Sequence, residues 1–392
     1  MNKNGKNKIA IVTTILDDWG GSEELWAKCI PFLNEENAKD VTVYKPRINF
    51  QHPQFLKLKA EGVKLKELLP QHSGLKKAGE ITKRIAAKFG LVSYNPDRAA
   101  QQLYDDLKVS QPALVIISQA INFDGLALAH QCFKLRISYV IICQKAVDFF
   151  WPEPSSRSWM KDTLLRAERV FFVSQHNKTL TEEQFGTRIR RSEVVFNPVK
   201  TGVSGLISYP DTTNGFRLAC IGRLFVIDKG QDILLRILAK PKWRDRNIGV
   251  SFLGTGPDAE GIKEMAELLG VSNVNFTGHR DDIAEVWKLH HALILPSRSE
   301  GLPLVVTEAM AAGRIAITTN AGGNAEIVEH DVTGFIGEAN EKDFEAALEQ
   351  AWDRRNEWQQ MGLQAAEHIK QVIPQLPEKQ FALRIIHIVG EL

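Results

Sequence analysis

The sequence predicts an α/β protein made of two doubly wound domains in tandem, each a parallel sheet with helices on both faces. Short apolar runs rich in Val and Ile alternate with helical stretches along the chain, and this alternation favours parallel strands that are buried on both sides. The length of 392 residues also exceeds that of one typical domain, since a domain averages about 150 residues.

Five apolar runs predict the strands of a first domain, residues 1–198, and six more predict those of a second domain, residues 199–370. The first set comprises residues 8–15, 40–44, 113–117, 138–143 and 169–173. The second set comprises residues 216–221, 248–253, 274–277, 292–295, 315–319 and 334–336. The stretch between the sets, near residues 198–214, is rich in Pro, Gly, Ser and Thr, as a linker would be. Residues 371–392 contain an amphipathic helix that we expect to cross back to the first domain.

The composition excludes several classes of protein. Lys and Arg number 49 against 47 Asp and Glu, so no global field points to nucleic acid or to an acidic partner. The four cysteines form no CxxC pair, which favours buried thiols in a reducing compartment over disulfides or zinc. No apolar run approaches the 18 residues of a membrane span. We therefore expect a cytoplasmic protein with at most peripheral membrane contact.

Four charged residues follow predicted strands of the second domain. Arg223 and Lys229 lie in a strand–turn–helix segment, and such a cation pair suits a diphosphate. Glu300 and Glu308 lie in a strand–loop–helix segment whose helix begins near Pro303, and carboxylates accept the hydroxyls of a sugar or a ribose. Because open parallel sheets bind ligands beyond the carboxyl ends of their strands, we expect a nucleotide-sugar site in the cleft between the two domains.

A glycine pair follows the first predicted strand of the first domain. Gly20 and Gly21 would let the backbone approach a ligand closely, and Ser22 can cap the next helix. A tight turn alone would explain the pair equally well. The GxGxxG fingerprint is missing, which argues against an NAD-type dehydrogenase.

The stretch from about Ser174 to Glu338 resembles the family-4 retaining glycosyltransferases of GT-B fold, whose two domains are Rossmann-like. The matching segments are FVSQHNK, FNPV, GRL with DKG, FLGTGPD, VNFTGHRDD, LPSRSEGLPLVVTEAMAAG and NAGGNAEIVEHDVTGF. The carboxylates Glu300 and Glu308 have the EX7E spacing of that family.

The resemblance implies a role for each matching residue. Arg223 and Lys229 would neutralise the diphosphate, Glu300 would lie near the donor sugar and Glu308 would hold the ribose. Further donor-binding positions are Gly20, Gly21, Gly222, Gly254, Gly256, His279, Arg280, Gly301, Leu302, Pro303, Leu304 and Val305. Of these, His279 and Arg280 fall where the family contacts the nucleobase.

One residue departs from the family pattern. Many members carry a histidine after the fourth strand of the first domain, and Gln144 occupies that position here. A glutamine can hydrogen-bond a sugar hydroxyl, but it cannot exchange a proton near neutral pH. We include Gln144 among the catalytic residues. Other candidate contacts of the first domain are Asn122, Asp124, Lys145 and Asp148.

The resemblance implies transfer of a hexose-type sugar from a UDP-sugar to a hydroxyl of a saccharide or lipid-linked acceptor, in surface polysaccharide or glycolipid synthesis. No DxD motif is present, so no metal or other cofactor is expected. Two alternatives stay open: a non-catalytic nucleotide-sugar binding subunit, which Gln144 motivates, and a sugar-nucleotide epimerase of the same architecture.

Residues 56–89 carry nine Lys or Arg against three Glu. Ile81, Ile85 and Phe89 recur every four residues, as they would in an amphipathic helix on an anionic membrane at the cytoplasmic face. A solvated basic helix packed on its own domain explains the same pattern.

Overall fold

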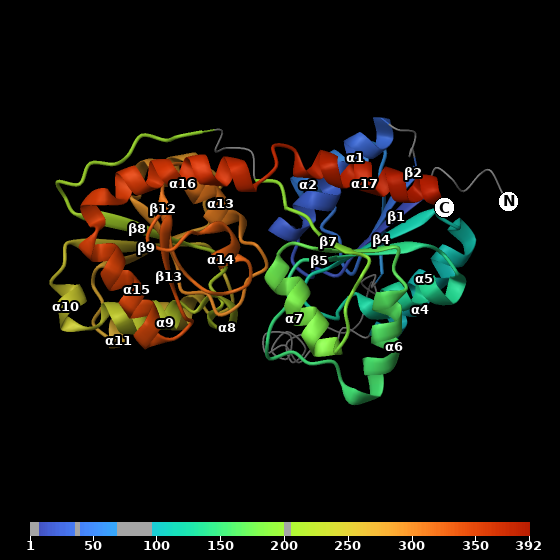
Figure 1. The fold of residues 1–392 in the computed structure, drawn as a ribbon, viewed down its shortest axis with the longest axis horizontal. Helices are drawn as coiled ribbons and strands as arrows, with labels where there is room; N and C mark the ends of the chain where they lie inside the picture. The colour runs from blue at the N-terminus through green and yellow to red at the C-terminus, as the bar shows by residue number, and fades with distance from the viewer. Residues whose placement is uncertain (1–7, 36–39, 69–95, 200–204) are drawn as a thin grey trace. The chain divides into compact units, whose positions relative to one another are not determined.

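The computed structural model describes residues 8–35, 40–68, 96–199 and 205–392. The chain divides into two compact units. Unit 1 comprises Met1–Pro198 and Leu376–Leu392, and unit 2 comprises Val199–Gln375. Each unit contains one parallel sheet with helices packed against it (Figure 1). The α/β class with two doubly wound sheets, predicted from the alternation of apolar runs and helices, is confirmed.

In the described residues of unit 1, the sheet has seven parallel strands in the order β3-β2-β1-β4-β5-β6-β7. The strands are β1 Lys8–Thr13, β2 Asp40–Lys45, β3 Lys64–Glu67, β4 Leu114–Gln119, β5 Tyr139–Cys143, β6 Arg169–Phe172 and β7 Ser192–Val194. The central strands β4 and β5 are buried along their whole length, which is why they read as continuous apolar runs.

The two edge strands of this sheet were not predicted. In β3 the sequence KLKE alternates exposed and half-buried residues, and its lysines pair with Asp40 at 2.7 Å and Asp106 at 2.9 Å. The strand β7 has only three residues. An edge strand with charged side chains, or one so short, lacks the hydrophobic run by which buried strands are recognised.

Helices cover both faces of the unit 1 sheet. They are η2 Gly21–Glu23, α1 Glu24–Glu35, α2 Pro53–Ala60, α4 Pro96–Ser110, α5 Leu126–Leu135, α6 Pro154–Leu165, α7 Gln175–Phe185 and α17 Pro377–Glu391. One core joins α1, α2 and α17 to the sheet, and the other joins α4 and α5 to its opposite face. The last helix, α17, lies beside α1 (Figure 1), and Phe381 packs edge-on against Phe171 of β6 with ring centroids 5.0 Å apart.

In unit 2, the part described from residue 205 onward forms a sheet of six parallel strands in the order β10-β9-β8-β11-β12-β13. The strands are β8 Phe216–Ile221, β9 Ile248–Leu253, β10 Val274–Gly278, β11 Ala292–Leu295, β12 Ile315–Thr319 and β13 Gly334–Gly337. The helices are α8 Val226–Lys229, α9 Gln231–Leu238, α10 Pro241–Arg244, α11 Ala259–Leu268, α12 Ile283–Leu289, α13 Leu304–Ala311, α14 Asn324–Ile327, α15 Glu341–Asp353, η3 Arg355–Glu357 and α16 Trp358–Val372.

The strand order reverses once in each sheet. In unit 2 the chain places β9 and β10 on one side of β8 and then continues with β11 on the other side. In unit 1 the same reversal falls between β1 and β4. Ligands of open α/β sheets bind at such switch points, beyond the carboxyl ends of the strands, so these two edges are where a site is expected.

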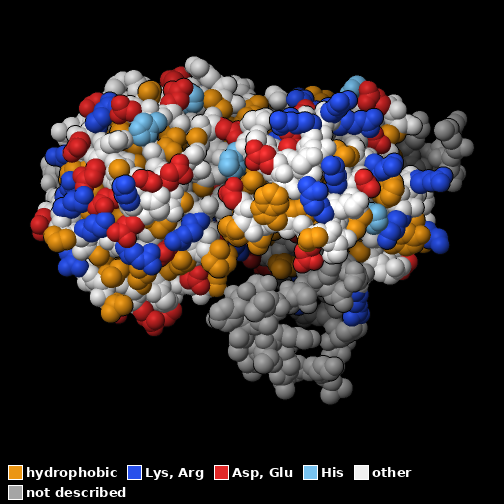
Figure 2. All heavy atoms as spheres, turned by 60° about the horizontal axis from the view of Figure 1, so that its bottom comes forward, with side chains coloured by type: hydrophobic (Ala, Val, Ile, Leu, Met, Phe, Trp, Pro, Cys, Tyr) orange, Lys and Arg blue, Asp and Glu red, His pale blue; other side chains and the backbone are white. Residues whose placement is uncertain are grey.

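Charges of both signs are interspersed on the face shown in Figure 2, in agreement with the balanced composition. None of the helices in the described ranges is long and apolar enough to cross a membrane. The four cysteines, Cys29, Cys132, Cys143 and Cys220, are buried free thiols. The predicted amphipathic repeat of Ile81, Ile85 and Phe89 lies outside the described residues.

Candidate functional site

Two loops at the carboxyl ends of β8 and β11 carry the predicted donor residues and are bonded to each other. The backbone carbonyl of Asp228 accepts hydrogen bonds from the backbone N–H groups of Arg298, at 2.8 Å, and Ser299, at 3.1 Å. Gly230 has φ +62°, and a Cβ there would lie 2.0 Å from the carbonyl oxygen of Pro296. A glycine is therefore required at the point where the two backbones meet.

Lys229 and Glu300, one from each loop, form an ion pair. The Nζ of Lys229 lies 2.5 Å from the Oε1 of Glu300, and the Oγ of Ser297 donates to the same oxygen at 2.7 Å. Glu300 is 5% exposed, whereas the Lys229 side chain is 23% exposed. An ammonium group has three N–H donors, so Lys229 can bond Glu300 and an anion at the same time.

Arg223 lies at the start of the β8 loop and is more open to solvent than Lys229. Its side chain is 44% exposed and approaches Oδ2 of Asp228 at 3.5 Å. The guanidinium lies over the ring of Phe225, 5.0 Å from the centroid. The loop therefore presents one exposed cation and one cation that is held by a buried carboxylate.

The second predicted carboxylate, Glu308, lies in α13 one turn after the helix begins and is 4% exposed. Pro303 is the N-cap of α13, so the N–H groups of Leu304 and Val305 are among the first of the helix. These groups have no partner within a helix and carry the positive end of its dipole. The preceding loop is fixed from the other side, because the N–H of Gly323 donates to the carbonyl of Gly301 at 2.7 Å.

The glycines predicted to line the donor pocket have a packing role as well. A Cβ on Gly254 would lie 2.0 Å from the carbonyl oxygen of Gly222, and one on Gly256 would lie 2.2 Å from that of Leu224. Gly322 was not predicted from the sequence, and a Cβ there would lie 2.2 Å from the carbonyl oxygen of Glu300. Four loops at this edge thus pack backbone against backbone.

A bidentate ion pair that links the segments after β8 and β11 was also not predicted from the sequence. Arg298 donates to both carboxylate oxygens of Asp232, at 2.7 and 2.9 Å, and to the carbonyl of Val226 at 2.7 Å. Burial acts to raise the pKa of Asp232, but hydrogen bonds from Arg298 and Arg236 outweigh it and hold the pKa below its ordinary value. The loop that carries Lys229 is thereby tied to the loop that carries Glu300.

His279 and Arg280 lie apart from these residues. They follow β10, the edge strand of the sheet, and both are exposed. The Nε2 of His279 lies 3.1 Å from Asp281. The carbonyl of Gly278 accepts a hydrogen bond from the N–H of Gly254 at 2.8 Å, which connects this loop to the glycine loop after β9. Their contact with a nucleobase stays a prediction.

In unit 1, the glycine loop after β1 is anchored by a buried ion pair. Glu23 accepts a hydrogen bond from the N–H of Gly20 at 2.7 Å and pairs with Nζ of Lys45 at 2.9 Å. Both charged side chains are fully buried. Burial raises the pKa of Glu23 to about 6, although Lys45 and the Gly20 N–H act in the opposite direction. The sequence reasoning identified Gly20 and Gly21 but missed Glu23, whose signal was its place in the segment GGSE.

Gln144 bonds the same glycine loop from the end of β5. Its Nε2 donates to the carbonyl of Ser22 at 3.1 Å, and its amide exchanges hydrogen bonds with the amide of Asn197 at 2.8 and 3.3 Å. Gln144 is 5% exposed. Through these contacts Gln144 holds the glycine loop in place at this edge of the sheet. Its role in catalysis stays a prediction.

The remaining candidates of unit 1 support a neighbouring loop. Asn122 and the buried Gln184 both donate to the carbonyls of Val147 and Phe150. Asp124 accepts a hydrogen bond from the N–H of Ile121 at 3.2 Å, and burial raises its pKa to about 7. Lys145 is half-buried and Asp148 is exposed. No group of three or more His, Cys, Asp or Glu side chains in the described part of the chain could hold a metal ion.

Two parallel doubly wound sheets, each with a candidate site at its switch point, define the GT-B class of fold. Solved structures agree with this assignment. The chain aligns with HepE of Anabaena in complex with UDP at a TM-score of 0.69 and 18% identity, over 98% of this chain and 100% of that one. It aligns with sucrose-phosphate synthase from Thermosynechococcus elongatus at a TM-score of 0.72 and 13% identity, over 98% and 100%.

The family follows from the sequence of unit 2. Residues 211–368 match the model of the family described as glycosyl transferases group 1. This match lies within unit 2 and supports the resemblance to a family-4-like glycosyltransferase.

Two curated relatives each match a little under half of the chain. An uncharacterized glycosyltransferase of Haemophilus influenzae is 32% identical over 178 residues, which are 44% of this chain and 48% of that protein. A GDP-mannose-dependent alpha-(1-6)-phosphatidylinositol monomannoside mannosyltransferase of Mycolicibacterium smegmatis is 34% identical over 212 residues, 48% of this chain and 54% of that protein. The chain thus spans about half the length of the curated relatives it matches.

Proposed function

We propose that the protein is a retaining glycosyltransferase. It transfers a hexose-type sugar from a nucleoside diphosphate sugar to a hydroxyl of a saccharide or lipid-linked acceptor, in surface polysaccharide or glycolipid synthesis. The observation that carries the proposal is the contact of Lys229 with Glu300 at the switch point of unit 2. The contact supports the proposal because Lys229, the cation proposed for the diphosphate, and Glu300, the carboxylate proposed for the sugar, meet there.

In the proposed reaction the bond between the anomeric carbon and the diphosphate oxygen breaks, and its electron pair goes to the leaving phosphate. Arg223, Lys229 and the first N–H groups of α13 stabilise the negative charge that develops there. Preorganised electrostatics of this kind is commonly the largest contribution to catalysis. The acceptor oxygen bonds to the same face of the sugar, and its proton passes to the leaving phosphate, so that configuration is retained. These cations take the part that a metal ion has in other transferases, and we propose a metal-independent enzyme.

We propose UDP-sugar as the donor. Solved structures of the same fold were obtained with UDP and with UDP-glucose, which supports this choice. A specific observation favours a second candidate, because the mannosyltransferase of M. smegmatis is GDP-mannose-dependent. Both donors present the same diphosphate to Arg223 and Lys229, so the base decides between them.

Titration calorimetry with UDP, GDP and ADP tests the donor site. We expect UDP to bind most tightly, and we expect Lys229→Met to weaken that binding about 10- to 100-fold, since hydrogen bonds between charged groups contribute about 1.5–3 kcal/mol each. Lys288→Met is the matched control, because Lys288 is exposed in α12 of the same unit. If none of the nucleotides binds, or if both variants bind like the wild type, the proposed site is wrong.

Turnover separates the proposed transferase from the alternatives. A transferase releases UDP only as the sugar moves to an acceptor, whereas an epimerase converts the free sugar nucleotide without any acceptor. A non-catalytic subunit binds the nucleotide and does neither. Glu300→Ala should abolish transfer if Glu300 acts at the donor sugar.

We also propose a cytoplasmic protein that contacts anionic membranes through residues 56–89. The described part of this stretch gives little support, because Lys64 and Lys66 are paired with Asp40 and Asp106. Support therefore rests on the sequence of residues 69–89. Sedimentation with anionic vesicles is the test, and an unchanged bound fraction after reversal of the charges at Lys76, Lys77 and Lys83 would exclude this contact.

A further inference from the structure

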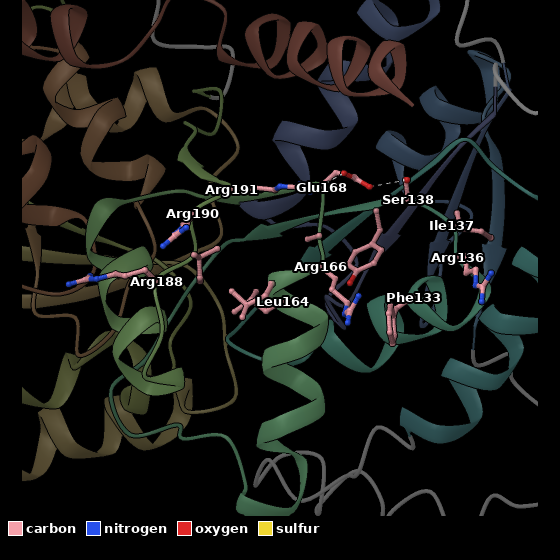
Figure 3. A pocket seen from close by; sticks show the side chains of 14 residues that line it. Phe133, Arg136, Ile137, Ser138, Leu164, Arg166, Glu168, Arg188, Arg190 and Arg191 are labelled. Carbon is pink, nitrogen blue, oxygen red and sulfur yellow. Dashed lines mark hydrogen bonds and ion pairs between the residues drawn. The ribbon is translucent and has the colours of Figure 1, made fainter.

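A groove lined by arginines lies at the amino-terminal edge of the unit 1 sheet, where β5, β6 and β7 begin. The edge is the one opposite to the switch point that bears Gly20 and Gln144. Among the residues that the structure describes, five arginines and one carboxylate line the groove, which has a volume of about 830 Å³. The arginines are Arg136, Arg166, Arg188, Arg190 and Arg191. Figure 3 shows them on three separate segments: the end of α5, the end of α6 and the segment before β7.

Two of the five arginines are occupied by carboxylates. Arg191 lies 3.4 Å from Glu168, the acidic residue of the groove, which also accepts a hydrogen bond from Ser138 at 3.1 Å. Arg188 lies 2.6 Å from Glu182 and points away from Leu164 (Figure 3). These pairs neutralise one side of the groove.

The other three cations lack such partners. Within the described ranges, no carboxylate lies within ion-pair distance of Arg136, Arg166 or Arg190. All three residues are exposed. The guanidinium of Arg166 lies over the ring of Phe133, 5.0 Å from its centroid, which fixes the cation at the wall of the groove.

The floor between these cations is apolar. Leu164 lies between Arg190 and Arg166 in Figure 3, and Tyr139 and Ile189 are buried beside it. The hydroxyl of Tyr139 is engaged with the carbonyl of Thr163 at 2.5 Å, so the ring offers the groove an apolar surface. A ligand that fits must combine several negative charges with a less polar part.

We propose that this groove binds a small molecule that carries two or more clustered phosphate groups. The volume falls in the range of small-molecule sites, about 300–1,000 Å³. Arginine forks match phosphate oxygens in pairs, and three cations without carboxylate partners suit a multiply charged anion. A membrane surface fits less well, because bilayers contact protruding surfaces and these cations line a concavity. The site is separate from the proposed donor site, which lies in unit 2.

Titration calorimetry with inorganic tripolyphosphate tests the proposal on the full chain. We expect binding that weakens with added salt. The double variant Arg166→Gln/Arg190→Gln should bind about tenfold or more weakly per arginine removed, since each charge-assisted hydrogen bond is worth at least that factor. The matched control is Lys108→Gln/Lys379→Gln, which removes the same charge from exposed positions of α4 and α17 in unit 1.

A second variant separates this groove from the donor site, which also attracts phosphates. Lys229→Met should leave tripolyphosphate binding at the groove unchanged. The proposal is overturned if the wild type does not bind, if the arginine variant binds as tightly as the lysine control, or if Lys229→Met abolishes binding. Sedimentation with phosphatidylglycerol vesicles tests whether the groove binds lipid phosphates instead. If the vesicles bind through these arginines and tripolyphosphate does not bind, the ligand is a membrane and the proposal of a small molecule is wrong. Near-UV circular dichroism checks that each variant is folded.

Discussion

Removal of the ammonium group from the buried pair under the glycine loop should cost unit 1 much of its stability. In Lys45→Met, Glu23 keeps its hydrogen bond from Gly20 but loses its contact with the Lys45 ammonium group at 2.9 Å, in a place where both side chains are fully buried. Breaking such a pair costs about 3–5 kcal/mol. That loss is a large part of the roughly 5–15 kcal/mol that stabilises a typical domain.

Urea denaturation at pH 7 measures this cost, and the structure supplies a control. Lys64 and Asp40 pair at 2.7 Å, but the side chains are 62% and 34% exposed, so Lys64→Met should cost at most about 1 kcal/mol. The cost of Lys45→Met should fall near pH 5, because Glu23, whose pKa is raised to about 6, is already protonated there. Equal costs for the two variants at pH 7 would refute the reasoning.

Two further predictions concern single residues. Gly230→Ala should destabilise unit 2 by about 2–5 kcal/mol, because the residue has φ +62° and its Cβ would lie 2.0 Å from a carbonyl oxygen. The control is Gly261→Ala in α11, where a Cβ would meet open space; it should be neutral or stabilising by up to about 1 kcal/mol. Denaturation midpoints of the two variants and the wild type measure the difference. Asp124 has a pKa raised to about 7 by burial, so its contribution to stability is full below its unfolded pKa of about 3.9 and is lost as pH rises through 7. Asp124→Asn should therefore be more stable than the wild type at pH 8 and no more stable at pH 4. Melting curves of both proteins at the two pH values test this, and a stability difference that is the same at pH 4 and pH 8 would contradict it.

The sequence predicts the buried strands well, because a strand covered on both faces is a run of Val, Ile and Leu. It does not predict β3, where charged residues alternate with half-buried ones, or β7, which is only three residues long. Strands are recognised in a sequence by the apolar residues that they bury. An edge strand such as β3 or β7 buries few of them and is therefore missed.

The same distinction applies to the candidate site. Motifs predict Arg223, Lys229 and Glu300 as site residues, but the contacts that arrange the candidate site join residues far apart in the chain. Glu23 and Lys45 are 22 positions apart, Gln144 and Asn197 are 53 apart, and Arg298 and Asp232 are 66 apart. No local pattern encodes such pairs, since they depend on which loops the sheet topology brings together.

The close contacts of the glycines at Gly230, Gly254, Gly256 and Gly322 with neighbouring carbonyls restrict how this protein can be re-engineered. Loops that touch through their backbones cannot be lengthened or exchanged one at a time, because each shift would collide with the next loop. A library that aims at a new donor for the proposed transferase should therefore keep loop lengths fixed and vary only exposed side chains, with His279, the predicted nucleobase contact whose side chain is 66% exposed, as a first position. In these loops of unit 2, substitutions would then be tolerated, whereas insertions and deletions would be selected against.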